Sequence, residues 1–157
     1  MYHIHTDGSC LDNNANTGGG PGGIGCVIVH NGIEIQRSLG FYKTTNNRME
    51  MMAIVYMLEE LQEPTEVEIF TDSEYTINCV TKWYWGWVAK KWITGSGKPV
   101  QNKDLVIRIR ALMGYHDVKF NKVKGHSGDY YNELCDKLAK EGAANPTEID
   151  VGFLNRF

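Results

Sequence analysis

The sequence predicts one α/β domain built on a five-stranded mixed sheet that is flanked by helices. Three apolar runs come first with no helical segment between them, and helical and strand-like patterns alternate after them. Strands joined by short connections pair antiparallel, whereas strands separated by a helix usually pair parallel. We therefore expect the first three strands to be antiparallel and the last two parallel, with helices on both faces. No internal repeat or linker interrupts residues 1–157, which indicates a single domain.

The first three strands are predicted within residues 2–42. The run YHIHT at 2–6 alternates in polarity, and a loop rich in Gly and Asn follows it. Residues 24–42 contain two more apolar runs, which meet at Asn31-Gly32. Asn-Gly supplies the positive φ angles of a two-residue turn, so these runs predict a hairpin.

The rest of the chain predicts four helices and two strands. Residues 46–62 form the first helix, because apolar side chains recur at a helical period, an Asn opens the segment and Pro64 follows it. The later elements are a strand at 67–71, a helix at 73–87, a basic Gly-broken stretch at 90–102, a helix at 102–115, a strand at 117–123, a loop at 124–130, a helix at 131–144 and a polar C-terminal tail at 144–157.

The composition, with 42% hydrophobic and 22% charged residues, is typical of a soluble globular protein. No apolar run approaches the roughly 20 residues that span a bilayer, and no secretory signal opens the chain. The four cysteines are scattered, without the clustering of a disulfide framework or a zinc site. We expect a cytoplasmic, monomeric protein with reduced thiols and no membrane partner.

Charge is distributed unevenly along the chain. Residues 82–124 contain ten Lys or Arg against two acids, a balance of +8, so the remainder must carry −11 to give the net charge of −3. A solvated helix face usually mixes both signs. The asymmetry instead predicts a basic face for a polyanion.

Two glycine motifs resemble phosphate-binding loops in pattern only. Residues 20–25 (GPGGIG) match G-x-G-x-x-G, but a dinucleotide site needs this motif to open a helix, and here it opens a strand. We expect these glycines to let the backbone turn tightly beside a site. Residues 95–98 (GSGK) lack the Ser or Thr that follows the Lys of a nucleotide-binding P-loop.

Four acids occupy positions where the pattern calls for apolar or turn residues. Asp7 and Asp72 end the first and fourth predicted strands, each after a Thr, while Glu50 and Asp136 lie among apolar residues of the first and last helices. Each acid taken singly is explained as a turn former, a helix cap or an exposed residue. Together they converge if the first and fourth strands are neighbours. Such a cluster needs a counter-ion, and oxygen-binding divalent cations fit.

These motifs identify a resemblance to the type 1 ribonuclease H family. The chain matches it from Met1 to Thr147 through TDGSC, GGPGGIG, TTNNRMEMMA, TDSEY, a W-x-x-x-W helix with a basic extension, KPVQNKDL, VKGHSG and NELCDKLA. The resemblance implies the ribonuclease H fold and an endonuclease that hydrolyses the RNA strand of RNA–DNA hybrids. It also implies two Mg²⁺ ions, with Mn²⁺ as an alternative, and products with 5′-phosphate and 3′-hydroxyl ends.

The resemblance also implies roles for individual residues. Asp7, Glu50, Asp72 and Asp136 correspond to the metal-binding catalytic carboxylates, and His126 to a residue that assists proton transfer or product departure. A His that titrates near neutrality suits that role. The implied substrate contacts are Cys10, Thr45, Asn46, Asn47, Glu74, Lys90, Lys91 and Lys98. Arg48, beside them, is either a further contact or half of a structural ion pair.

The aromatic segment KWYWGWVAKKW allows two interpretations. Its rings could stack on nucleic acid, or Trp83, Trp87 and Trp92 could form the packing seam of a protruding helical handle. The resemblance favours the handle, with Lys90 and Lys91 among its phosphate contacts.

Three features depart from the family pattern. The loop LDNNANTGGG is longer, and Glu74 replaces the usual Gln, where it could repel phosphate or add an outer contact to a metal. The handle also carries fewer basic residues, which predicts weaker binding with a shallower salt dependence. Two other functions remain open, a DNA nuclease of related fold and a non-catalytic hybrid-binding module.

Overall fold

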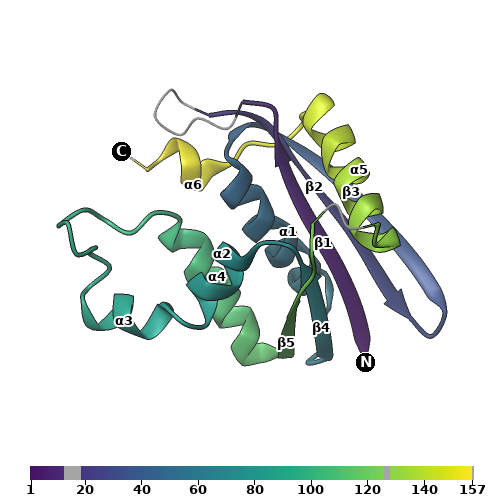
Figure 1. The fold of residues 1–157 in the computed structure, drawn as a ribbon, viewed down its shortest axis with the longest axis horizontal. Helices are drawn as coiled ribbons and strands as arrows, with labels where there is room; N and C mark the ends of the chain where they lie inside the picture. The colour runs from purple at the N-terminus through teal and green to yellow at the C-terminus, as the bar shows by residue number, and fades with distance from the viewer. Residues whose placement is uncertain (13–18, 126–127, 157) are drawn as a thin grey trace.

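The protein folds around the predicted five-stranded mixed sheet (Figure 1). The computed structural model describes residues 1–12, 19–125 and 128–156. The strands lie in the order β3-β2-β1-β4-β5. The first three are antiparallel, and β4 and β5 run parallel to β1, as predicted. Their bounds are β1 Tyr2–Cys10, β2 Gly20–His30, β3 Ile33–Thr44, β4 Glu66–Thr71 and β5 Asp117–Lys122.

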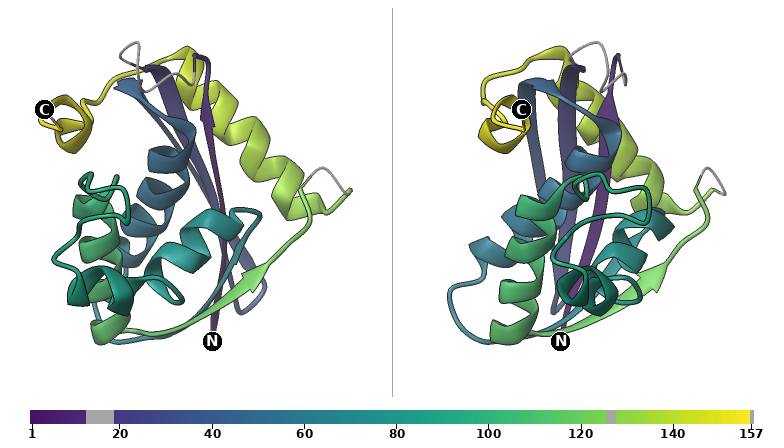
Figure 2. Two further views of the ribbon diagram at one scale, coloured as in Figure 1. Left: turned by 60° about the vertical axis from the view of Figure 1, so that its left-hand side comes forward. Right: turned by 90° about the vertical axis from the view of Figure 1, so that its left-hand side faces the viewer.

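Helices cover both faces of the sheet, which confirms the predicted layering (Figure 2). Helix α5 packs on β1, β2 and β3, while α1 packs on the other face and carries α4 on its outer side. The larger apolar core lies between the sheet and α1, and a smaller one lies beneath α5. The helices are α1 Asn46–Glu60, α2 Glu74–Val80, α3 Tyr84–Ala89, α4 Lys103–Tyr115, α5 Tyr130–Ala144 and α6 Val151–Leu154.

The glycines of residues 20–25 serve a different purpose from the predicted tight turn. They lie inside β2, which begins at Gly20 rather than at the expected residue 24. A Cβ on Gly23 or Gly25 would overlap backbone carbonyl oxygens of α5. These glycines therefore allow a helix to approach the sheet closely, a role that the local pattern does not reveal.

The helix predicted at 73–87 is two helices. Helix α2 ends at Val80 and α3 begins at Tyr84, with Thr81 in a non-helical conformation between them. The Thr81 hydroxyl donates to the Ile77 carbonyl at 2.6 Å. A β-branched residue whose hydroxyl binds the preceding turn favours an end to the helix at that point.

Residues 81–102, here called the handle, connect α2 with α4 and project from the body of the protein (Figure 1). The ring centroids of Trp83 and Trp87 lie 5.9 Å apart, and those of Trp87 and Trp92 lie 5.8 Å apart. The neighbouring indoles are thus in contact, and Trp87 and Trp92 pack against the core as predicted, whereas Trp83 is 36% exposed. None of the helices in the described ranges is long and apolar enough to cross a membrane.

Candidate active site

Asp7 and Asp72 are brought together by the parallel pairing of β1 and β4. The register pairs Tyr2 with Val67 and His5 with Phe70, and its continuation along both strands reaches Asp7 and Asp72. The prediction that Asp7 ends its strand was wrong, because β1 continues to Cys10 through its pairing with β2. Asp7 instead marks the point where β1 parts from β4, so its carboxylate sits where the sheet opens.

Glu50 reaches this point from helix α1, which packs on β1. A Cβ on Gly8 would overlap the backbone nitrogen of Glu50, so glycine at this position lets the first turns of α1 lie against the strand. The Glu50 residue is only 9% exposed. Its Oε2 is buried and has no hydrogen-bond partner among the described residues. A buried carboxylate oxygen without a partner is costly in a folded protein, so this oxygen is suited to bind a cation or a water molecule.

The three carboxylates form a compact cluster. One oxygen from each of Asp7, Glu50 and Asp72 lies within 4.8 Å of the others. Burial, with a smaller contribution from the charges of Asp72 and Asp136, raises the pKa of Asp7 to about 7. Burial first and the charge of Asp7 second raise the pKa of Glu50 well above its usual value. A bound divalent cation would relieve the repulsion between the negative charges of these carboxylates.

Asp136 lies near the cluster but outside the compact set. It is on α5, its side chain is 26% exposed, and Lys140 one turn later holds it with an Nζ to Oδ2 distance of 2.9 Å. Its charge is nevertheless close enough to raise the pKa of Asp7. The structure thus brings three of the four predicted acids together and holds the fourth beside them on another element.

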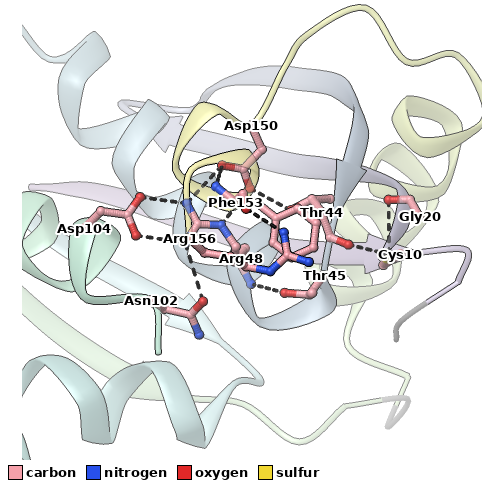
Figure 3. Close-up of polar contacts among 10 residues, drawn as sticks. All are labelled: Cys10, Gly20, Thr44, Thr45, Arg48, Asn102, Asp104, Asp150, Phe153 and Arg156. Atoms are coloured by element: carbon pink, nitrogen blue, oxygen red, sulfur yellow. Dashed lines mark hydrogen bonds and ion pairs between the residues drawn. The ribbon is translucent and has the colours of Figure 1, made fainter. Parts of the chain in front are cut away.

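The implied substrate contacts at the start of α1 lie close together. Thr45 is the N-cap of α1 and accepts from the Arg48 backbone N–H at 3.3 Å, while Asn46 and Asn47 open the helix. The Cys10 thiol donates to the carbonyl oxygens of Gly20 and Thr44, at 3.6 and 3.5 Å (Figure 3). The end of β1, the end of β3 and the start of α1 therefore meet at one point.

The other implied contacts are dispersed. Lys90, Lys91 and Lys98 are exposed on the handle, whereas Glu74 is the first residue of α2. An acid in a first helical turn is favoured by the helix dipole, which gives Glu74 a structural explanation. His126 and most of the long loop, residues 13–18, lie outside the described residues.

Arg48 forms a structural ion pair, and its partners were not predicted. Its Nε donates to Asp150 at 2.7 Å, and its guanidinium also binds Asp104 through two nitrogens, at 2.8 and 2.7 Å (Figure 3). Asp150 is 1% exposed and also accepts from the Thr44 hydroxyl at 2.8 Å. The segment that its composition marked as a polar tail thus supplies a buried anchor. No local sequence signal connects residues so far apart in the chain.

Comparisons with known proteins place this chain in a family. The RNase H family model matches residues 1–144. The chain is 46% identical to a ribonuclease H of Actinobacillus pleuropneumoniae, with 98% of this chain and 97% of that protein covered. It is 47% identical to ribonuclease HI of Pasteurella multocida, with coverages of 98% and 96%.

Solved structures agree with this result. LC9-RNase H1, described as a type 1 RNase H with the type 2 active-site motif, superposes with a TM-score of 0.79 at 26% identity, covering 99% of this chain and 79% of that one. LC11-RNase H1, solved in complex with an RNA/DNA hybrid, gives a TM-score of 0.67 at 25% identity, with coverages of 92% and 97%.

Proposed function

The chain belongs to the RNase H family and is an endoribonuclease of that class, and we propose that it cleaves the RNA strand of RNA–DNA hybrids with the help of two divalent cations. The proposed metal-binding carboxylates are Asp7, Glu50, Asp72 and Asp136. Mg²⁺ is the proposed physiological ion, with Mn²⁺ as a substitute. The proposed products carry 5′-phosphate and 3′-hydroxyl ends.

One observation carries this proposal, namely the convergence of Asp7, Glu50 and Asp72 around a buried carboxylate oxygen without a partner. All the donors are carboxylate oxygens, which suits hard cations such as Mg²⁺ and Mn²⁺ rather than soft metals. The donor set therefore fits the cations that the family implies. When bound, such cations activate the attacking water and offset the charge that develops on the leaving 3′-oxygen.

The protein's own residues supply position and proton transfer in this reaction. Asp7 is held in the paired strand β1, Asp72 directly follows the paired strand β4, and Glu50 is held by a helix packed on Gly8, so the donors are preorganised. Asp136 completes the set from α5. We propose that His126 takes or delivers a proton as the product departs, which suits an imidazole near neutral pH.

Substrate recognition is proposed at the start of α1 and on the handle. Amide side chains and the thiol of Cys10 can contact 2′-hydroxyls and minor-groove edges, by which a protein distinguishes RNA from DNA. The lysines of the handle would contact phosphates without reading sequence. The solved complex of LC11-RNase H1 with a hybrid supports this class of substrate. We also propose a monomer in a reducing, cytoplasmic compartment, in keeping with four cysteines that form no disulfide in the described chain.

A direct assay tests this function. We would incubate the protein with an RNA–DNA hybrid, a duplex DNA and a single-stranded RNA of one sequence, each with Mg²⁺ or Mn²⁺ and with EDTA. Metal-dependent cleavage confined to the RNA strand of the hybrid, with 5′-phosphate ends, is expected. Cleavage of duplex DNA would identify the related-fold DNA nuclease instead, and binding without cleavage would identify a hybrid-binding module.

A further inference from the structure

Helix α5 contacts the sheet in different ways at its start and in its middle. It lies over β1, β2 and β3 on one face of the sheet (Figure 2). In the middle it approaches backbone closely, because a Cβ on Gly25 would overlap the Cys135 carbonyl oxygen. In its first turn, Tyr131 instead stacks on His5 of β1, with ring centroids 4.3 Å apart and an interplanar angle of 26°. An aromatic contact therefore holds the N-terminal turn of α5 on the sheet.

Phe70 extends this contact to β4. His5 and Phe70 are partners in the parallel register of β1 and β4, and their ring centroids lie 4.7 Å apart with an interplanar angle of 14°. The His5 ring is thus stacked between Phe70 and Tyr131, and we call these three residues the ring stack. Stacked rings at such separations attract one another beyond the effect of the apolar area that they bury. The ring stack therefore joins β4, β1 and α5 at one point.

The ring stack lies one step before the carboxylate cluster on both strands. His5 precedes Asp7 by two residues on β1, so the two side chains share a face of the sheet and are separated by roughly 6.6 Å along the strand. Phe70 likewise precedes Asp72 by two residues, and Asp72 directly follows β4. The rings are therefore the neighbours of the carboxylates on the side towards the start of each strand.

Helix α5 advances in the same direction as β1. Its first turn contacts β1 through Tyr131. Cys135, about one turn later, lies against Gly25, and this glycine pairs with Asp7 in the sheet. Asp136 is the next residue of the helix, a rise of roughly 7.5 Å from Tyr131. The ring stack thus fixes α5 at a point less than two turns before its carboxylate.

The position of the Asp136 carboxylate depends on how α5 sits on the sheet. Lys140 holds this carboxylate with an Nζ to Oδ2 distance of 2.9 Å, but Lys140 belongs to the same helix. An ion pair within one helix moves with the helix and cannot fix it against the strands. A small tilt or rotation of α5 would therefore shift Asp136 relative to Asp7 while the strand pairing of β1 stayed intact.

A second tyrosine–histidine stack lies at the other end of β1. Tyr2 opens the strand and stacks on His30 at the end of β2, with ring centroids 3.9 Å apart and an interplanar angle of 9°. This pair joins two strands that are already hydrogen-bonded to each other. Its loss should therefore lower stability without moving α5, which makes it a comparison for the ring stack.

We propose that the ring stack positions the Asp136 carboxylate for metal binding by fixing the N-terminal turn of α5 on the sheet. Phe70, His5 and Tyr131 are positioning residues that act through Asp136. This inference rests on the proposed function, in which Asp136 is one of the metal-binding carboxylates.

The test replaces Tyr131 with Leu, which keeps apolar bulk without a planar ring, or with Phe, which keeps the ring. Tyr2→Leu is the matched control, because it removes the other stack. Mn²⁺ binding is measured without substrate by electron paramagnetic resonance, and hybrid cleavage is measured at several Mg²⁺ concentrations. We expect Tyr131→Leu to weaken Mn²⁺ binding several-fold and to lower kcat by roughly tenfold to a hundredfold, with KM within about twofold. Tyr131→Phe and Tyr2→Leu should match the wild type.

Further variants separate the ring stack from general damage to the fold. His5→Leu removes the middle ring and should reproduce the loss, whereas His5→Phe keeps a ring that can stack and should not. In the Asp136→Asn background, Tyr131→Leu should have no further effect on Mn²⁺ binding, because its effect passes through that carboxylate. Thermal unfolding in EDTA should remain cooperative for each variant.

Two results would overturn the proposal directly. One is Mn²⁺ binding and kcat in Tyr131→Leu equal to those in Tyr2→Leu, and the other is an effect on Mn²⁺ binding that persists in the Asp136→Asn background. A rise in KM alone would assign the rings to substrate binding and would also overturn it. If Tyr131→Leu does not fold, the comparison of His5→Leu with His5→Phe decides in its place. A wild-type protein that leaves the hybrid intact would refute the proposed function, whereas Mn²⁺ binding by the variants would still test the ring stack.

Discussion

Asp7 on β1 and Asp72, the residue after β4, fall at matched positions where the parallel register of the two strands is continued, and one carboxylate oxygen from each lies within 4.8 Å of the other and of one from Glu50. The backbone pairing of β1 with β4 sets this separation, so two acidic groups are kept together although their charges repel. Folding energy from the rest of the sheet maintains an arrangement that is unfavourable on its own. A site of this kind is preorganised for a cation.

Replacing Asp72 with Asn should abolish hybrid cleavage. The change removes one negative charge and one strong oxygen donor with almost no change in volume, so hybrid binding should persist while kcat falls by at least about a hundredfold to a thousandfold, the range found when a transition-state contact is lost. The measurement is single-turnover cleavage together with fluorescence anisotropy. Glu63→Gln, an exposed acid between α1 and β4, is the matched control and should keep full activity. Normal cleavage by Asp72→Asn would refute the metal role.

The stability of the metal-free protein should depend on pH through Asp7. Burial raises the pKa of this carboxyl from 3.8 to about 7 in the folded state. The folded protein therefore binds more protons than the unfolded chain between about pH 4 and pH 7. Stability from this group is complete below pH 4 and is lost as pH rises towards 7. In EDTA, the unfolding free energy of the wild type minus that of Asp7→Asn should therefore fall over this range.

The comparison with Asp7→Asn is needed because titration of His5 changes the unfolding free energy with pH in the opposite direction. Its ring is stacked between Phe70 and Tyr131, and burial lowers its pKa from 6.5 to about 4. Its contribution is present above pH 6.5 and is lost as pH falls towards 4. Because both proteins contain His5, subtraction removes its effect. A flat difference across pH 4 to 7 would contradict the raised pKa of Asp7. Added Mg²⁺ should stabilise the wild type far more than the variant.

The sequence predicted the sheet and the cluster because both follow from local patterns. Alternating runs located β1 and β4, and Asp7 and Asp72 follow a Thr in each run. Other features depend on packing between distant segments. Nothing near Gly25 in sequence indicates that α5 rests on it, and nothing near Asp150 indicates that Arg48 is its partner. The break at Thr81 was missed because the apolar pattern continues into the aromatic seam of the handle.

The buried ion pair should matter far more to stability than its exposed counterpart. Asp150→Asn leaves Arg48 without its most buried partner, and loss of one member of a buried pair typically costs about 3–5 kcal/mol. Asp104→Asn affects the same guanidinium, but the Asp104 side chain is 46% exposed, so we expect a loss of about 1 kcal/mol or less. Urea unfolding of both variants measures these values. Equal losses would show that burial does not govern the energetics of this network.

Gly25→Ala should lower both stability and activity, because Gly25 pairs with Asp7 in the sheet and also supports α5. The added Cβ would overlap the Cys135 carbonyl oxygen and lie 2.6 Å from the Ala139 nitrogen. Backbone atoms cannot rotate away, so α5 must move, at a cost of at least about 1–3 kcal/mol.

Asp136 follows Cys135 on α5, so movement of the helix would also shift this carboxylate relative to the cluster, and kcat should fall more than KM changes. Gly86→Ala is the control, because a Cβ there meets no atom within 4 Å and the substitution should stabilise α3 by up to about 1 kcal/mol. A Gly25→Ala protein with wild-type stability and kcat would show that α5 does not rest on this glycine.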